Sequence, residues 1–148
     1  MSGTVDASGL DGVLIYLEKL AATTGERLAA AVEIEAIKTV AAVVDTKLSG
    51  QVLNQRTGRL ASSIHQVTER TGNSVIATVG TDVVYAAIHE YGGTIVPKVA
   101  KALRFVIGDK TVVAKSVTMP RRSFLRSTLS DREQDIRAAL AAAVAGAA

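Results

Sequence analysis

The sequence predicts an α+β fold in which an antiparallel four-stranded sheet, made of two hairpins, packs against a long N-terminal helix and a C-terminal helix. Three observations lead to this prediction. The first third of the chain repeats aliphatic residues at helical spacing, the middle holds alternating segments separated by turn residues, and the last part returns to helical spacing. Strands that are grouped together and flanked by helices are typical of an α+β domain.

The composition indicates one domain covering residues 1–148. Hydrophobic residues make up 48% of the chain but aromatic residues only 3%, so aliphatic side chains must build the core. Cysteine is absent, which excludes disulfides and thiolate metal sites. The formal net charge of +3 permits contact with nucleic acid without indicating it. Charged residues interrupt every apolar stretch before the roughly 20 residues that a membrane span needs.

Two helices are predicted at the start of the chain. Asp11 can cap a short helix over residues 12–22, and Thr23 with Glu26 fits a capping box that opens a second helix. The second helix, residues 24–48, would be about 40 Å long and lie across the sheet. Its predicted core stripe consists of Leu28, Val32, Ile37, Val40, Val44 and Leu48, with Glu33, Glu35, Lys38 and Asp45 mostly off it.

Four strands and a final helix follow from the later pattern. Residues 61–70 and 74–81 form a predicted hairpin around a glycine turn at residues 71–74, and residues 103–107 form a second one with residues 113–119, around a turn at residues 108–110. The final helix is expected over residues 123–144. Its inward residues would be Phe124, Leu125, Leu129, Ile136, Leu140 and Val144. Ser130 with Glu133 predicts a kink near Ser130, and the alanine-rich tail, residues 142–148, is expected to fray.

The stretch from Gly80 to Pro97 links the two hairpins. Val84, Ala87, Ile88 and Tyr91 are spaced for one inward helical face. Gly92 and Gly93 then end the helical turn, because glycine tolerates the positive φ of a helix C-cap.

No catalytic, cofactor-binding or metal-binding residues are predicted. The pair His89-Glu90 lacks the second histidine that a zinc-protease helix would place at position 93, so a partnered polar Glu90 is the better interpretation. Ser62, Ser63 and His65 lie too close along one strand to act as nucleophile and base. Asp82 is expected to cap the short helix that follows it.

Two segments are predicted to form an interface. Arg121, Arg122 and Arg126 crowd a helix N-terminus, where the helix dipole disfavours cations. They are either a solvated first turn or a cluster that binds carboxylates on this chain or a neighbour. The extended loop, about residues 92–102, either folds back as an extra strand or docks on a partner; its predicted interface residues are Gly92, Gly93, Thr94, Ile95, Val96, Pro97, Lys98, Val99 and Lys101.

An ordered set of motifs carries a resemblance to a known family. The sequence reads TGRLASSI at residues 57–64, YAAIHEYGG at 85–93, KALRF at 101–105 and MPRRSFL at 119–125. This order resembles the bacteriophage virion-morphogenesis family of tail-completion or head–tail joining proteins. In that family a T/S-G-x-L-x-x-S-I segment precedes a Y-A-x-x-x-E-F/Y-G-G/T turn, and P-x-R-x-F-L opens the last helix.

The resemblance implies a non-enzymatic structural protein of the phage neck or tail end. Such a protein would assemble in the host cytoplasm as a ring at the head–tail junction, with six subunits as the expected count. Its partners would be copies of itself, the adaptor or stopper, and the tail terminator or tail tube, with non-specific contact to genomic DNA in the lumen and none to a membrane. The resemblance also favours docking for the loop. The alternatives are a small stand-alone nucleic-acid-binding module and, more remotely, a hydrolase.

Overall fold

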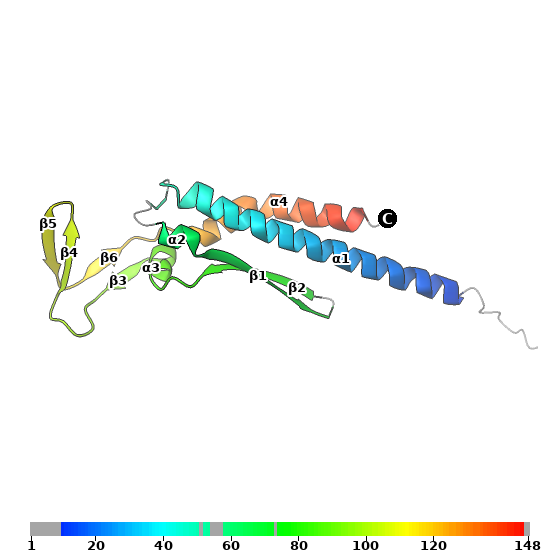
Figure 1. The fold of residues 1–148 in the computed structure, drawn as a ribbon, viewed down its shortest axis with the longest axis horizontal. Coiled ribbons are helices and arrows are strands. Elements are labelled where there is room, and N and C mark those ends of the chain that lie inside the picture. Colours follow the sequence, from blue (N-terminus) through cyan, green and yellow to red (C-terminus); the bar gives the residue numbers. More distant parts are fainter. Residues whose placement is uncertain (1–9, 51, 54–57, 73, 147–148) are drawn as a thin grey trace, which may run out of the picture. The chain divides into compact units, whose positions relative to one another are not determined.

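A computed structural model describes residues 10–50, 52–53, 58–72 and 74–146 (Figure 1). The chain has an α+β fold, as predicted. Its elements run in the order α1 (Leu10–Ala42), the π-helical turn η1 (Val43–Lys47), α2 (Arg59–Ser62), β1 (Ile64–Thr71), β2 (Ser74–Thr81), α3 (Ala86–Tyr91), β3 (Gly93–Ile95), β4 (Leu103–Ile107), β5 (Lys110–Ala114), β6 (Val117–Met119) and α4 (Leu125–Ala145).

The chain divides into two compact units. The first takes Met1–Lys38, Gln66–Thr78 and Arg132–Ala148, and the second takes Thr39–His65 and Val79–Asp131. In the first unit, the buried Glu35 of α1 pairs with Lys38 at 2.7 Å and with Arg132 of α4 at 2.6 Å. A buried carboxylate with two cationic partners is a satisfied group. The Glu35–Arg132 pair therefore fastens α4 to α1.

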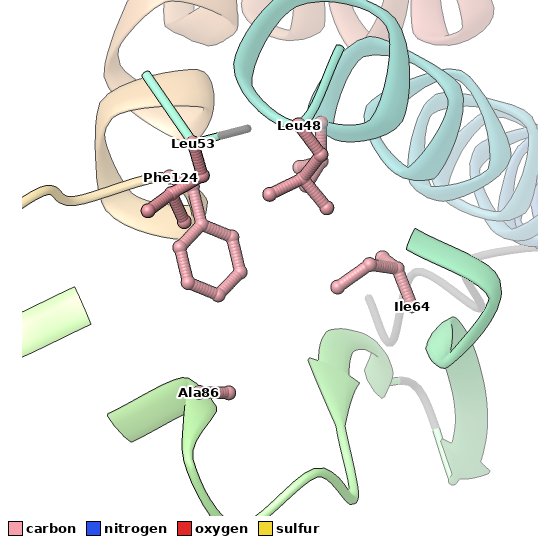
Figure 2. Close-up of a cluster of buried hydrophobic side chains, with 6 residues drawn as sticks. Leu48, Leu53, Ile64, Ala86 and Phe124 are labelled. Carbon is pink, nitrogen blue, oxygen red and sulfur yellow. The ribbon is translucent and has the colours of Figure 1, made fainter. Parts of the chain in front are cut away.

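The hydrophobic core lies in the second unit. Val43, Leu48, Leu53, Ile64, Ala86 and Phe124 are buried together, with partly buried aliphatic residues packed around them. Figure 2 shows Leu48, Leu53 and Phe124 close to one another, with Ile64 and Ala86 facing them from β1 and α3. Phe124 is the largest fully buried side chain. The segment before α4 therefore anchors the core.

The prediction of one four-stranded sheet is wrong. The described strands form three two-stranded antiparallel sheets, β1–β2, β3–β6 and β4–β5. Both hairpins exist, but the last predicted strand divides at residues 115–116, and its second half leaves β4 to pair with β3. A glycine with positive φ turns each hairpin, Gly72 and Gly108. Asn73, expected in the first turn, lies outside the described residues.

The predicted break between two N-terminal helices is also wrong, because α1 runs through it and Asp11 lies inside the helix. The hydroxyls of Thr23 and Thr24 donate to the carbonyl oxygens of Lys19 and Leu20, at 2.9 and 2.7 Å. Threonine side chains that bond back four residues are compatible with a continuing helix, so they do not cap a new one.

The buried face of α1 is displaced from the predicted stripe. The buried residues of α1 and η1 are Ala29, Glu35, Ala36, Thr39 and Val43. Leu48 is buried as predicted, Leu28, Val32, Val40 and Val44 are half-buried, and Ile37 is 53% exposed. Ala29, Ala36 and Val43 recur every seven residues, or two helical turns, and so share one face. The sequence pattern of large aliphatics missed this line because two of its members are alanines.

The inward faces of α3 and α4 were likewise only partly predicted. In α3 the buried residues are Ala86 and Glu90, whereas Tyr91 is exposed and Val84, just before the helix, is 94% exposed. In α4, Leu129 and Val144 are exposed, contrary to prediction. The expected kink near Ser130 is absent, because α4 is one helix and Glu133 pairs with Arg137 rather than capping a turn. The last two residues of the tail, 147–148, lie outside the described residues.

Candidate functional site

Two segments of the second unit run side by side and bring the family-like motifs together. Gly93, Thr94 and Ile95 of β3 pair with Met119, Thr118 and Val117 of β6. The contact continues beyond the strands, because the backbone N–H of Arg122 donates to the carbonyl oxygen of His89 at 2.8 Å. The end of α3 is thus fixed to the segment that leads into α4. We call this paired region, residues 89–95 and 117–126, the clamp.

Gly92 is the point of closest backbone approach in the clamp. Its φ is +71°, and a Cβ atom built on it would lie 2.8 Å from the backbone nitrogen of Arg121 and 3.1 Å from the carbonyl oxygen of Met119. Glycine is therefore required at position 92 for two reasons, the backbone conformation and the lack of space for a side chain. The glycine predicted from the sequence as a helix terminator also lets two chain segments meet.

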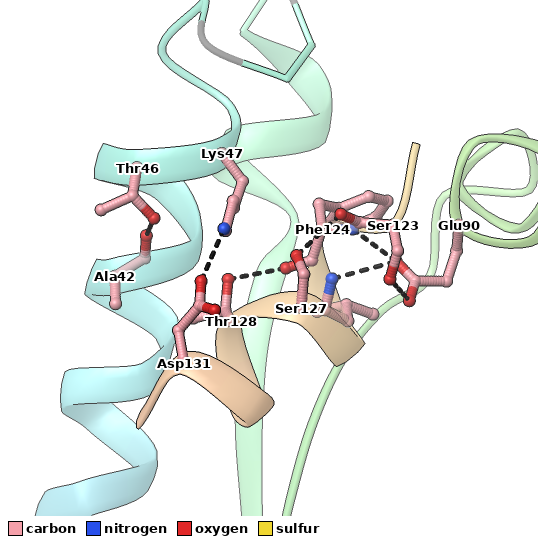
Figure 3. A network of polar contacts seen from close by, with 10 residues as sticks. Ala42, Thr46, Lys47, Glu90, Ser123, Phe124, Ser127, Thr128 and Asp131 are labelled. Atoms are coloured by element: carbon pink, nitrogen blue, oxygen red, sulfur yellow. Dashed lines mark hydrogen bonds and ion pairs between the residues drawn. The ribbon is translucent and has the colours of Figure 1, made fainter. Parts of the chain in front are cut away.

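Glu90 closes the clamp by capping α4. Its carboxylate accepts hydrogen bonds from the hydroxyl of Ser123 at 2.6 Å and from the backbone N–H of Phe124 at 2.8 Å (Figure 3). The backbone N–H groups of Leu125 and Arg126 donate to it as well, at 2.9 and 3.1 Å. The first turn of a helix has N–H groups without intrahelical partners and a partial positive charge, and a carboxylate satisfies both. Here the capping carboxylate comes from a different helix, so α3 holds the start of α4 in place.

The charge of Glu90 is stabilised although the side chain is only 3% exposed. Burial alone would raise the pKa of Glu90. The hydrogen bonds from Ser123 and from the N–H groups of Leu125, Phe124 and Arg126 outweigh that effect, and they lower the pKa below its ordinary value. The sequence interpretation of Glu90 as a partnered polar group is confirmed.

Side-chain contacts extend the clamp along α4. The hydroxyl of Thr128 donates to the carbonyl oxygen of Phe124 at 2.7 Å, and Lys47 of η1 forms an ion pair with Asp131 at 2.7 Å (Figure 3). The latter pair connects the π-helical turn to the second turn of α4. Clamp, π-helical turn and core thus form one connected framework within the second unit.

His89 is a half-buried residue of the clamp. Its ring meets the ring of Tyr85 edge to face at 6.1 Å, and its Nδ1 is buried with no hydrogen-bond partner among the described residues. Burial, and then the charge of Arg122, lower the pKa of His89, so the imidazole is neutral near pH 7. No group of three potential metal ligands occurs in the part of the chain that the structure describes.

The other residues considered for chemistry have structural contacts. Ser63 shares a hydrogen bond with Thr81 at 2.6 Å, and the Nδ1 of His65 lies 3.0 Å from the carbonyl oxygen of Ser63. Asp82 does not cap the short helix, because the N-cap residue of α3 is Tyr85 and no side chain forms a cap hydrogen bond there. Instead, the hydroxyl of Thr81 accepts the N–H of Val83 at 3.2 Å.

The three arginines of the predicted cluster lie on the surface of the clamp. All are exposed, and none forms an ion pair with another described residue. Arg126 places its guanidinium 5.0 Å from the centre of the Tyr91 ring, a cation–π distance. No partner among the described residues explains the cluster, and the carboxylate of Glu90 in the clamp is already used on backbone N–H groups.

The predicted interface loop is part strand and part exposed turn. Its first residues, Gly93–Ile95, form β3, so the loop does fold back there as an extra strand. Beyond β3, Val96 is 58% exposed and Val99 fully exposed, whereas Pro97 is half-buried. Lys98 and Lys101 are exposed beside them. The sequence placed the loop correctly but missed the pairing of β3 with β6, for which residues 93–95 carry no alternating signal.

The family-like motifs of this small α+β fold meet in the clamp, where strand pairing and the Glu90 carboxylate hold them together. Residues 18–145 match the phage virion morphogenesis family. The match spans most of the chain, which therefore belongs to that family. No curated protein and no solved structure matches significantly.

Family membership gives the chain a role in building the virion, which implies a non-enzymatic role. Within the described residues, no helix has the length and apolar content to cross a membrane.

Proposed function

We propose that this protein is a structural component of the phage neck or tail end that assembles as a ring, with six subunits, and joins or completes the connection between head and tail. It acts by geometry: the clamp fixes the start of α4, and the exposed residues beyond the clamp contact neighbouring subunits. The adaptor or stopper would bind on one side of the ring and the tail terminator or tail tube on the other.

The observation that carries this proposal is the exposed apolar surface next to the clamp. Between β3 and β6, five aliphatic residues are more than half exposed: Val96, Val99, Val106, Ile107 and Val113. Three of them lie on the β4–β5 hairpin, and a two-stranded hairpin is at best marginally stable alone in water. Exposed aliphatic residues beside a rigid framework support a docking surface.

Negative-stain imaging of the purified chain, alone and mixed with tail components, tests the ring. We expect closed rings of uniform diameter that attach to tail ends. A chain that stays monomeric in both samples, or that forms only open filaments, would overturn the proposal.

Binding to duplex DNA tests the rival function, a stand-alone nucleic-acid-binding module. The exposed arginines of the clamp favour some contact with DNA, but a binder that works alone needs several phosphate contacts and a steep dependence on salt. We expect weak binding that disappears at moderate salt. Submicromolar affinity at about 150 mM salt, or any preference for a base sequence, would favour the rival instead.

A further inference from the structure

The first turns of α1 expose an unusual run of apolar residues. Five consecutive residues, Val13, Leu14, Ile15, Tyr16 and Leu17, are each between 51% and 64% exposed. Successive residues of a helix point in different directions, so this segment is apolar around its whole circumference. Helices of that kind are normally buried. We call residues 13–17 the apolar turn.

A second surface has the opposite charge to the rest of the chain. Residues 92–126, which include the loop of residues 92–102 and the β4–β5 hairpin, hold eight lysines and arginines and a single acidic residue, Asp109, for a formal charge of +7. The rest of the chain holds nine basic and thirteen acidic residues, for a formal charge of −4. Residues 10–38, which include the apolar turn, hold five acidic and three basic residues. The two surfaces are therefore complementary in charge, and both expose aliphatic side chains.

We infer that the apolar turn of one copy packs on the β4–β5 hairpin of the next copy. This inference rests on the proposed self-assembly and names the two surfaces that meet in it. Packing of one apolar turn against another would bring two negatively charged helix segments together, whereas the hairpin offers exposed Val106 and Val113 within a basic surface. A contact between two different surfaces is heterologous, and heterologous contacts form a ring where the rotation between neighbouring copies closes.

Two double variants remove one surface each. Leu14→Glu with Leu17→Glu disrupts the apolar turn, and Val106→Glu with Val113→Glu disrupts the hairpin. All four positions are more than half exposed, so the folded monomer should keep its circular dichroism spectrum and melting temperature. Leu129→Glu, at a similarly exposed position of α4, is the matched control and should assemble like the unmodified chain.

Mass measurement by light scattering gives the decisive result. Each double variant alone should be monomeric. An equimolar mixture of the two should form a dimer and nothing larger, because it contains only one intact pair of surfaces. A hairpin variant that still assembles alone, or a mixture that stays monomeric, would overturn the inference.

The control experiment separates this inference from the proposed function. If the unmodified chain forms rings and both double variants form the same rings, the subunit contact lies elsewhere and only the inference fails. If the unmodified chain forms no assembly, alone or with tail components, the ring itself is wrong and this contact is wrong with it.

Discussion

The carboxylate of Glu90, in α3, accepts the backbone N–H of Leu125, the first residue of α4, at 2.9 Å. The same carboxylate also binds Ser123, Phe124 and Arg126. The side chain of Glu90, in the motif at residues 85–93, therefore holds the helix start in the motif at residues 119–125. Four of the five predictions that follow concern this clamp and the core behind it.

Removing the carboxylate should destabilise the protein strongly. Glu90→Ala leaves three N–H groups and one hydroxyl without their acceptor, so we expect the free energy of unfolding to fall by about 2–4 kcal/mol, measured by urea denaturation. Ser123→Ala removes one of the four donors and should cost only about 0.5–1.5 kcal/mol. Equal losses in the two variants would contradict the capping role of Glu90.

The protein should lose stability on acidification in two steps. The pKa values of His89 and Glu90 are both lowered in the folded state, so each group contributes stability that is present above its unfolded pKa and lost as the pH falls towards its folded pKa. The His89 step should begin near pH 6.5 and the Glu90 step near pH 4.3. Urea midpoints measured from pH 8 to pH 3 should show both steps. Glu90→Gln should remove the lower step and keep the upper one, and loss of both steps together would refute the assignment.

Gly92→Ala should cost more than an equivalent change at another glycine with positive φ. Gly108, with φ +58°, has no heavy atom within 4 Å of an added Cβ, whereas at Gly92 the added atom would meet the backbone of Arg121. Gly108→Ala should therefore cost about 1 kcal/mol for the backbone conformation alone. Gly92→Ala should cost about 2 kcal/mol more, because the added atom forces backbone atoms to move. Equal melting temperatures for the two variants would show that the clamp is loose.

Val43→Ala should test the core against a matched surface change. Val43 is fully buried and Val84 is 94% exposed, so the same substitution removes the same atoms from opposite environments. We expect a loss of about 1.5–3 kcal/mol for Val43→Ala and less than about 0.5 kcal/mol for Val84→Ala, both measured by denaturation. Similar small losses would place the π-helical turn outside the core.

Limited proteolysis should report docking of the loop after β3. Cleavage after Lys98 should be fast in the free chain and suppressed in assembled particles. Val99→Asp should impair joining without lowering the monomer's melting temperature, because Val99 is fully exposed. Ile95→Asp is unsuitable for this test, since Ile95 pairs with Val117 in the β3–β6 sheet and its loss would damage the fold. Equal protection of Lys98 in both states would contradict docking.

Features that depend on neighbouring residues could be predicted from the amino-acid pattern alone. Helical spacing predicted α1 and α4, and alternation with a glycine turn predicted both hairpins, turned at Gly72 and Gly108. The ordered motifs pointed to the virion morphogenesis family, which residues 18–145 confirm. These signals are local, because periodicity and turn conformation act over a few residues.

Contacts between distant segments of the chain could be seen only in the folded molecule. Glu90 binds Phe124 across 34 positions of sequence, and β3 pairs with β6 rather than extending a four-stranded sheet. The capping motifs at Thr23 and Ser130 were overridden, because α1 and α4 continue through them. A cap is used only where a helix ends, and the helix ends where packing stops it. The start of α4 is therefore set by a carboxylate from another helix, a contact that no local pattern contains.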